Sequence, residues 1–157
     1  MNSEQLRYPL RGWIEILHFF SVYGRLKPSK RGGACMKENA LTDKSIAFAA
    51  RIVKLHRYLI KDKKETVISK QIVRSGTSIG ANINEANYGQ SKADFISKLH
   101  IALKETAETE YWLKLLMMSE YITADMGNSL LNDCLAIKRI LIASINTAKE
   151  KNSKELE

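Results

Sequence analysis

The sequence has little cysteine and proline, with two of each among 157 residues, and both prolines lie within the first 35. Two cysteines, Cys35 and Cys134, cannot supply the disulfide framework of a small secreted domain, so we expect a reducing, cytoplasmic setting. No stretch approaches the roughly 18 uncharged apolar residues of a membrane-spanning helix, which excludes such a helix. Because 45% of the residues are hydrophobic and 27% are charged, the composition is that of a folded domain.

The first 35 residues differ from the rest. They hold Pro9, Pro28, four of the eight glycines and five of the twelve aromatic residues, and their apolar stretch is interrupted by Glu15 and His18. A secretory signal peptide has a cleaner apolar run. We therefore expect residues 1–35 to be a leader outside the domain, either disordered or translated upstream of a true start at Met36. Residues 36–157 are expected to form the domain.

Beyond Met36 there is no proline, and glycine occurs at only four positions, which favours long helices. We predict helices from Thr42 to the lysine cluster that begins at Lys61, and then over about 65–88, 92–119 and 124–149. The expected N-caps are Thr42, Ser91 (with Asp94 completing a capping box) and Thr123. Short connections make successive helices antiparallel, so the predicted fold is an all-α, up-down-up-down four-helix bundle.

The apolar residues exceed what one core needs. The first helix carries two stripes: Phe48, Ile52, Leu55 and Leu59 form one, and Ile46, Ala49, Val53 and Ile60 form the other. The predicted core stripes of the next three helices are Ile68, Ile72, Ile79, Ile83 and Ala86; Phe95, Ile96, Leu99, Leu103 and Ala107; and Leu130, Cys134, Ile137, Leu141 and Ile145. Beside the third helix's core stripe runs another with Ile101, Glu105, Glu108, Trp112 and Leu115. Surplus apolar surface of this kind marks an interface, so we expect an oligomer.

Small residues interrupt the second helix at Gly76 and Gly80, where each glycine costs about 1 kcal/mol of helix propensity. A helix that keeps such residues requires another backbone close by. We interpret Gly76, Gly80 and the bulky Trp112 as packing residues of the core or the oligomer.

Two long segments resemble a known family. Ser75–Ala86 (SGTSIGANINEA) and Phe95–Glu105 (FISKLHIALKE), the latter followed by Glu108–Leu113 (ETEYWL), are similar to the four-helix-bundle proteins encoded in bacterial ribosomal RNA intervening sequences. The resemblance covers about residues 36–151. It implies a cytoplasmic bundle that assembles as a ring-like homopentamer. For the related accessory proteins of diversity-generating retroelements, which belong to the same broader group, the resemblance implies binding to nucleic acid and to a reverse transcriptase.

A carboxylate-bridged metal pair in a bundle needs Glu-x-x-His motifs, and the only one here is Glu15 to His18. We therefore predict no metal and no cofactor. Asn82, Glu85, Glu105 and Glu108 are expected to form a partly buried polar network that Arg51 or Arg74 balances, because carboxylates inside a bundle must be paired.

Catalytic patterns are missing as well. Cys134 lies on an apolar stripe and is expected to be an inert core thiol. No strand precedes Gly76 and Gly80, and no Gly-Lys-Ser/Thr follows them, so they do not form a phosphate loop. The sequence predicts a protein that is not an enzyme.

The basic residues are concentrated in one region. Seven basic residues and two acidic ones lie between positions 54 and 74, and the basic set is Lys54, Arg57, Lys61, Lys63, Lys64, Lys70 and Arg74. By contrast, positions 105–125 hold five acidic residues and one basic residue. We predict that the basic set binds RNA or DNA without reading bases, and that a nucleic-acid-handling protein can be a partner. The alternative is a structural or protein-interaction scaffold that binds no nucleic acid.

Overall fold

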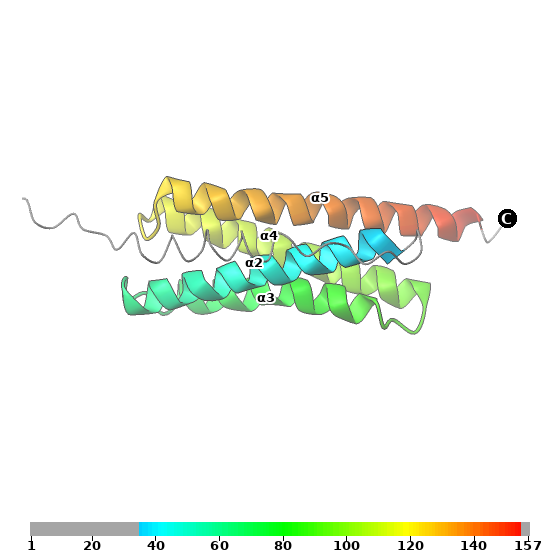
Figure 1. Ribbon diagram of the computed structural model, residues 1–157, viewed down its shortest axis with the longest axis horizontal. Coiled ribbons are helices and arrows are strands. Elements are labelled where there is room, and N and C mark those ends of the chain that lie inside the picture. Colours follow the sequence, from blue (N-terminus) through cyan, green and yellow to red (C-terminus); the bar gives the residue numbers. More distant parts are fainter. Residues whose placement is uncertain (1–34, 155–157) are drawn as a thin grey trace, which may run out of the picture. The chain divides into compact units, whose positions relative to one another are not determined.

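The computed structural model describes residues 35–154, and within them it forms four α-helices and no strand (Figure 1). They are α2 (Cys35–Lys61), α3 (Ile68–Ala86), α4 (Lys92–Met118) and α5 (Ala124–Lys154). Each helix packs against two others in the cyclic order α2–α3–α4–α5. The predicted all-α antiparallel bundle is confirmed. The expectation of a leader over residues 1–35 concerns positions that, apart from Cys35, lie outside the described residues.

Three N-caps were predicted, and two are confirmed. The backbone N–H of Asp94 donates to Ser91 Oγ at 3.1 Å, while the N–H of Gln90 donates to the Asp94 carboxylate. Thr123 Oγ1 accepts from the N–H of Met126 at 3.3 Å. The prediction for Thr42 is wrong: α2 already runs from Cys35, because no proline or glycine lies between Met36 and Thr42 to stop the helix.

The connection between α2 and α3 is fixed by Glu65, whose side chain is buried. Its carboxylate accepts hydrogen bonds from three backbone N–H groups at the start of α3, those of Val67 (2.8 Å), Ile68 (2.8 Å) and Ser69 (2.7 Å). Burial raises the pKa of Glu65, but these bonds outweigh it and hold the pKa below its usual value. The negative charge of Glu65 therefore interacts favourably with the positive end of the α3 dipole.

Glu65→Ala is expected to lower the free energy of unfolding by about 1–2 kcal/mol, because three N–H groups lose their acceptor. Since the pKa of Glu65 is depressed in the folded state, its contribution is complete above the unfolded value of about 4.3 and is lost as the pH falls through the folded pKa. Urea unfolding of both proteins at neutral and acidic pH measures the difference. The matched control is Asp62→Ala, in the same connection but exposed; an equal effect of the two changes contradicts the assignment.

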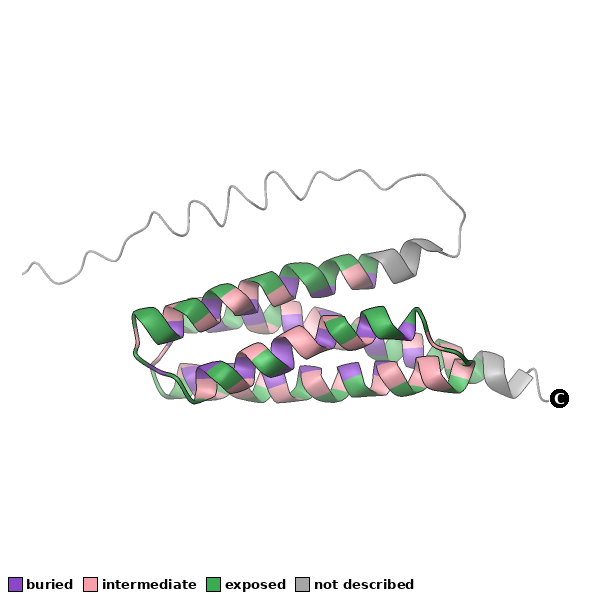
Figure 2. Ribbon diagram, turned by 90° about the horizontal axis from the view of Figure 1, so that it is seen from below, coloured by how far each residue is buried: buried purple, intermediate pink, exposed green. Residues whose placement is uncertain are grey.

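One stripe of each helix fills the core (Figure 2). The predicted stripes of α3 and α5 are buried, apart from Ile68, which is half-buried. On α2 the stripe of Phe48, Ile52, Leu55 and Leu59 is buried, whereas the stripe that begins at Ile46 lies outside it.

The predicted core stripe of α4 is displaced. The buried residues are Leu99, Ala102, Thr106, Thr109, Leu113 and Leu116, while Leu103 is half-buried and Ala107 is exposed. Two threonines enter the core because their hydroxyls bond within the helix. Thr106 donates to the carbonyl of Ala102 at 2.7 Å, and Thr109 donates to that of Glu105 at 2.8 Å. With their polar atoms satisfied, they can occupy core positions that a count of apolar residues assigns elsewhere.

The two glycines of α3 lie against α2. A Cβ atom on Gly76 would come within 2.9 Å of both γ carbons of Ile52, and one on Gly80 within 3.3 Å of Ser45 Oγ. The first neighbour is a fully buried β-branched side chain, and the second is the small buried hydroxyl of Ser45, which donates to the carbonyl of Thr42. The close approach of α2 and α3 therefore depends mainly on Gly76.

Gly76→Ala is expected to destabilise the bundle by about 1–2 kcal/mol, because overpacking against Ile52 exceeds the gain in helix propensity. Gly80→Ala has the same gain and a softer neighbour, so its expected effect is near zero or stabilising. Thermal unfolding followed by circular dichroism compares the two. If Gly76→Ala proves as stable as Gly80→Ala, the packing assignment is contradicted.

Candidate functional site

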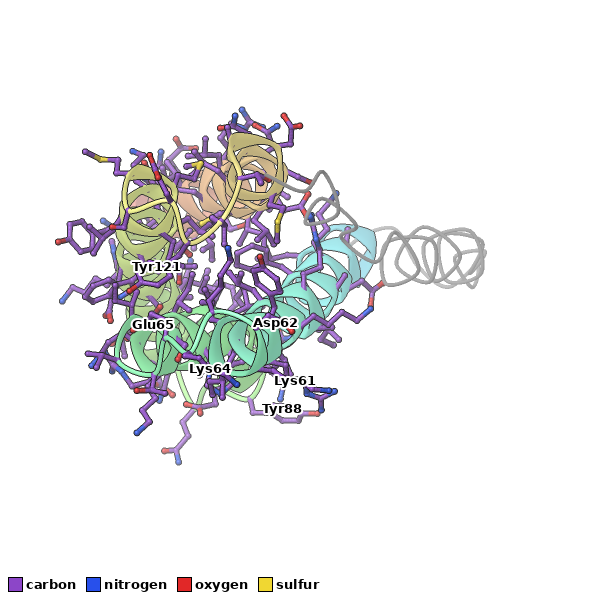
Figure 3. The ribbon with its side chains drawn as sticks, turned by 90° about the vertical axis from the view of Figure 1, so that its left-hand side faces the viewer. Lys61, Asp62, Lys64, Glu65, Tyr88 and Tyr121 are labelled. Atoms are coloured by element: carbon purple, nitrogen blue, oxygen red, sulfur yellow. The ribbon has the colours of Figure 1, made fainter. Side chains whose placement is uncertain are left out.

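The predicted basic residues lie along α2, its connection to α3 and the first half of α3. Lys54, Arg57 and Lys61 are spaced three and four apart on the exposed side of α2, and Lys70 is exposed near the start of α3. Figure 3 views the bundle from the end that carries the connection, where Lys61 and Lys64 are labelled. We call Lys61, Lys63 and Lys64 the lysine end.

Backbone contacts hold the lysine end in one conformation. The N–H of Asp62 donates to the carbonyl of Tyr58 at 2.9 Å, and the N–H of Glu65 donates to that of Leu59, also at 2.9 Å. Lys64 has a left-handed backbone with φ of 57°, and the Lys63 ammonium lies 5.9 Å from the centre of the Tyr58 ring. Glu65 is occupied by α3, so Asp62 is the exposed carboxylate within this connection. Three lysines thus stand beside one exposed carboxylate in this connection, while the negative charge of Glu65 faces the positive end of the α3 dipole.

Arg74, also in the predicted basic set, is engaged differently. Its guanidinium donates to the Glu108 carboxylate of α4 at 2.8 Å, and the indole N–H of Trp112 donates to the same oxygen at 3.1 Å. An arginine held by a carboxylate contributes less positive field than an unpaired one. Arg74 and Trp112 therefore belong to the polar contacts between α3 and α4.

The predicted polar network is divided into separate groups. Glu85 pairs with Lys98 at 2.6 Å, and the Asn82 amide donates to the carbonyl of Ser78 in its own helix. Glu85 lies eleven residues after Arg74 on α3, about three turns away, so the antiparallel α4 brings Lys98 rather than Glu108 opposite it.

Arg51 lies on another side of the bundle, where it binds Asp133 and Ser129 Oγ of α5. It therefore does not balance the carboxylates of α4, and of the two arginines considered for that role only Arg74 is placed there.

Glu105 is the least satisfied carboxylate of the described residues. Its side chain is half-buried, and its Oε2 atom is buried without a hydrogen-bond partner. Burial raises the pKa of Glu105, the nearby charge of Glu108 raises it further, and Arg74 opposes both.

Known proteins share this sequence pattern and this helical architecture. The model of the 23S rRNA-intervening sequence protein family matches residues 37–143. The chain belongs to this family. It is similar to a protein of unknown function from the S23 ribosomal protein family of Bacteroides thetaiotaomicron, solved as a crystal structure at 1.70 Å. The two are 57% identical with a TM-score of 0.69, over 70% of this chain and 98% of that one. No curated protein matches the chain.

One ion-pair group of this family member was missed by sequence reasoning. Glu110 of α4 binds Lys114 at 2.6 Å and Lys138 of α5 at 2.8 Å, and the hydrogen bonds from these two lysines hold the pKa of Glu110 below its usual value. The spacing of four between Glu110 and Lys114 is a signal that could have found the first pair. The second pair depends on the packing of α5 against α4.

The described residues contain no group of three His, Cys, Asp or Glu side chains placed to hold a metal ion. None of the described helices has the length and apolar character needed to cross a membrane. Cys134 is fully buried on α5, with its Sγ 3.5 Å from the carbonyl oxygen of Thr106. Burial raises the pKa of the Cys134 thiol to about 12.

Cys134 is expected to resist alkylation by iodoacetamide at neutral pH in the folded protein, because the reactive thiolate is absent and the sulfur is buried. The measurement is the mass added over time to a Cys35→Ser variant, with and without urea. Fast labelling is expected only after unfolding. Fast labelling of the folded variant contradicts the placement of Cys134.

Proposed function

We propose that this protein is a non-enzymatic, ring-like homo-oligomer that binds the phosphate backbone of nucleic acid through its lysine end. What supports the proposal is the cluster of Lys61, Lys63 and Lys64 on a connection whose backbone is held by hydrogen bonds, with the neighbouring Glu65 carboxylate turned to the start of α3. A backbone held in this way presents the three ammonium groups to a polyanion without first having to order the connection.

Assembly strengthens the attraction. Residues 36–157 carry 19 basic and 15 acidic side chains, a net charge of +4 per copy and +20 for the homopentamer that the family resemblance implies. A ring whose axis is parallel to the helices gathers the lysine ends of all copies at one rim. Charges of one sign on a closed rim add their fields, which raises the local concentration of a polyanion.

The recognition is expected to be independent of base sequence. Tyr88 is 81% exposed and is an aromatic side chain on which a base can stack, but α3 separates it from the lysine end. Tyr58 lies half-buried beneath Lys63. The proposed contacts are therefore with phosphates, and both RNA and DNA in the cytoplasm are suitable ligands. We also propose that a protein that handles nucleic acid binds the resulting complex.

Changing Lys61, Lys63 and Lys64 together to Glu is expected to weaken binding of labelled single-stranded RNA about tenfold or more at low salt. It should also make the affinity less dependent on salt. Fewer phosphates are then contacted, so binding releases fewer counterions. Fluorescence anisotropy over a salt series measures both quantities, and labelled DNA is tested in parallel.

The matched control changes Lys44, Arg139 and Lys149 to Glu, which alters the net charge equally at exposed positions away from the lysine end and from the apolar surface stripes of α2 and α4. This variant is expected to retain most of the affinity. If wild-type protein binds neither RNA nor DNA at low salt, or if both triple variants lose affinity equally, the proposal fails. The first result leaves the scaffold alternative.

A further inference from the structure

Two stripes on the surface of the bundle are only partly covered by the rest of the chain. The α2 stripe consists of Ile46, Ala49, Val53 and Ile60, and Ile46 is 61% exposed. The α2 stripe borders α3. The glycines of α3 face Ser45 and Ile52 of α2, and these two residues are the sequence neighbours of Ile46 and Val53.

The second surface is the α4 stripe, formed by Ile101, Glu105, Glu108, Trp112 and Leu115. Ile101 is 37% exposed, and the other four are half-buried. The α4 stripe also borders α3, because Glu108 pairs with Arg74. It combines apolar side chains with two carboxylates, one of which has a buried oxygen without a partner.

The two stripes are complementary in charge. Arg57 lies four residues after Val53 and three before Ile60, so a guanidinium stands beside the α2 stripe. Glu105 and Glu108 are the charged members of the α4 stripe. A cation beside one apolar surface and carboxylates within the other favour contact between the two, and repel contact of either surface with itself.

The two stripes also match in height along the bundle. Ser45 lies level with Gly80 of α3, and Glu85, five residues further along, pairs with Lys98 of α4. Because α3 and α4 are antiparallel, position 103 of α4 has the height of Gly80. The first isoleucine of each stripe, at positions 46 and 101, therefore lies within one helical turn of the other in height.

At the other end, His56 lies 3.0 Å from the carbonyl oxygen of Ser69, five residues before Arg74. Arg74 pairs with Glu108, so the same counting brings Arg57 to the height of position 113 or 114.

Side chains on a helix lean toward its N-terminus. Because α2 and α4 run in the same direction, the Glu108 side chain leans the same way as that of Arg57, and five or six positions, about 8 Å along the axis, separate the two residues, a gap that the long arginine side chain can span. Glu105, three positions further away, lies beyond its reach.

We propose that the α2 stripe of one copy packs on the α4 stripe of the next, with Arg57 of the first copy binding Glu108 of the second. This interface rests on the homo-oligomer proposed above and specifies its contacts. The two stripes lie on adjacent sides of the bundle that share α3, about a quarter-turn apart. Head-to-tail contacts at that angle close after about four or five copies, with α3 on the inner wall.

The interface is tested with a chain that carries Ile46→Cys and Ile101→Cys in a Cys35→Ser background, treated with a short thiol-to-thiol cross-linker. The expected result on a denaturing gel is a ladder of covalent oligomers that ends at the number of copies in the ring. Ile46→Cys or Ile101→Cys alone is expected to give no ladder, because each stripe meets the other and not itself.

The matched control pairs Ile46→Cys with Ile142→Cys, an isoleucine of α5 that is 42% exposed and outside both stripes. A ladder from this control, or from Ile46→Cys alone, overturns the proposed interface. Absence of a ladder in a test variant that light scattering shows to be oligomeric also overturns the interface, and leaves the proposed ring standing. Absence of a ladder in a monomeric protein overturns both.

Charge reversal provides an independent arm. Arg57→Glu is expected to raise the concentration at which the oligomer dissociates about tenfold or more, and adding Glu108→Lys in the same chain is expected to reverse part of that loss, although it also removes the ion pair with Arg74. Arg139→Glu, which makes the same charge change on the exposed side of α5, is expected to have no effect. Dissociation that the second change does not reverse at all overturns the pairing of Arg57 with Glu108.

Discussion

A core that is filled by one stripe per helix is the constraint on which the rest of this structure depends. Phe48, Ile52 and Leu59 of α2 are buried together with stripes from α3, α4 and α5, which leaves no interior room for a second stripe. Ile46 and Ile101 consequently lie on the surface. Their exposure costs roughly 25 cal/mol for each Å² of apolar area that contact with another molecule would cover. The proposed association of copies follows from this constraint, and the proposed pooling of charge follows from the association.

Much of the fold could be predicted from the sequence, for reasons that are local. Proline is absent beyond residue 36, and Ser91 and Thr123 bond to their own first turns, so the start of α4 and of α5 required no knowledge of the tertiary structure. The burial of Thr106 and Thr109 could not be predicted by counting apolar residues, because it depends on hydroxyl bonds inside the helix. Likewise, α2 includes residues before Thr42 because no proline or glycine between Met36 and Thr42 ends the helix.

The candidate site was less predictable than the fold. The seven basic residues could be grouped by their position in the sequence, yet only the structure separates the lysine end from Arg74, which Glu108 binds. The buried capping role of Glu65 was not predicted either, because the helix was expected to begin at about residue 65, whereas α3 begins at Ile68 and Glu65 precedes it. Pairings between helices, such as Glu85 with Lys98, depend on axial height, and a single sequence does not give that height directly.

Small-angle X-ray scattering of the wild-type protein at micromolar concentration tests the central claim most directly, because forward scattering gives the mass and the distance distribution gives the shape. The account predicts a particle of several copies with the distance distribution of a closed, hollow assembly. Scattering from single bundles, with the mass of one chain and an elongated profile, would contradict it, because the α2 stripe would then remain in contact with water.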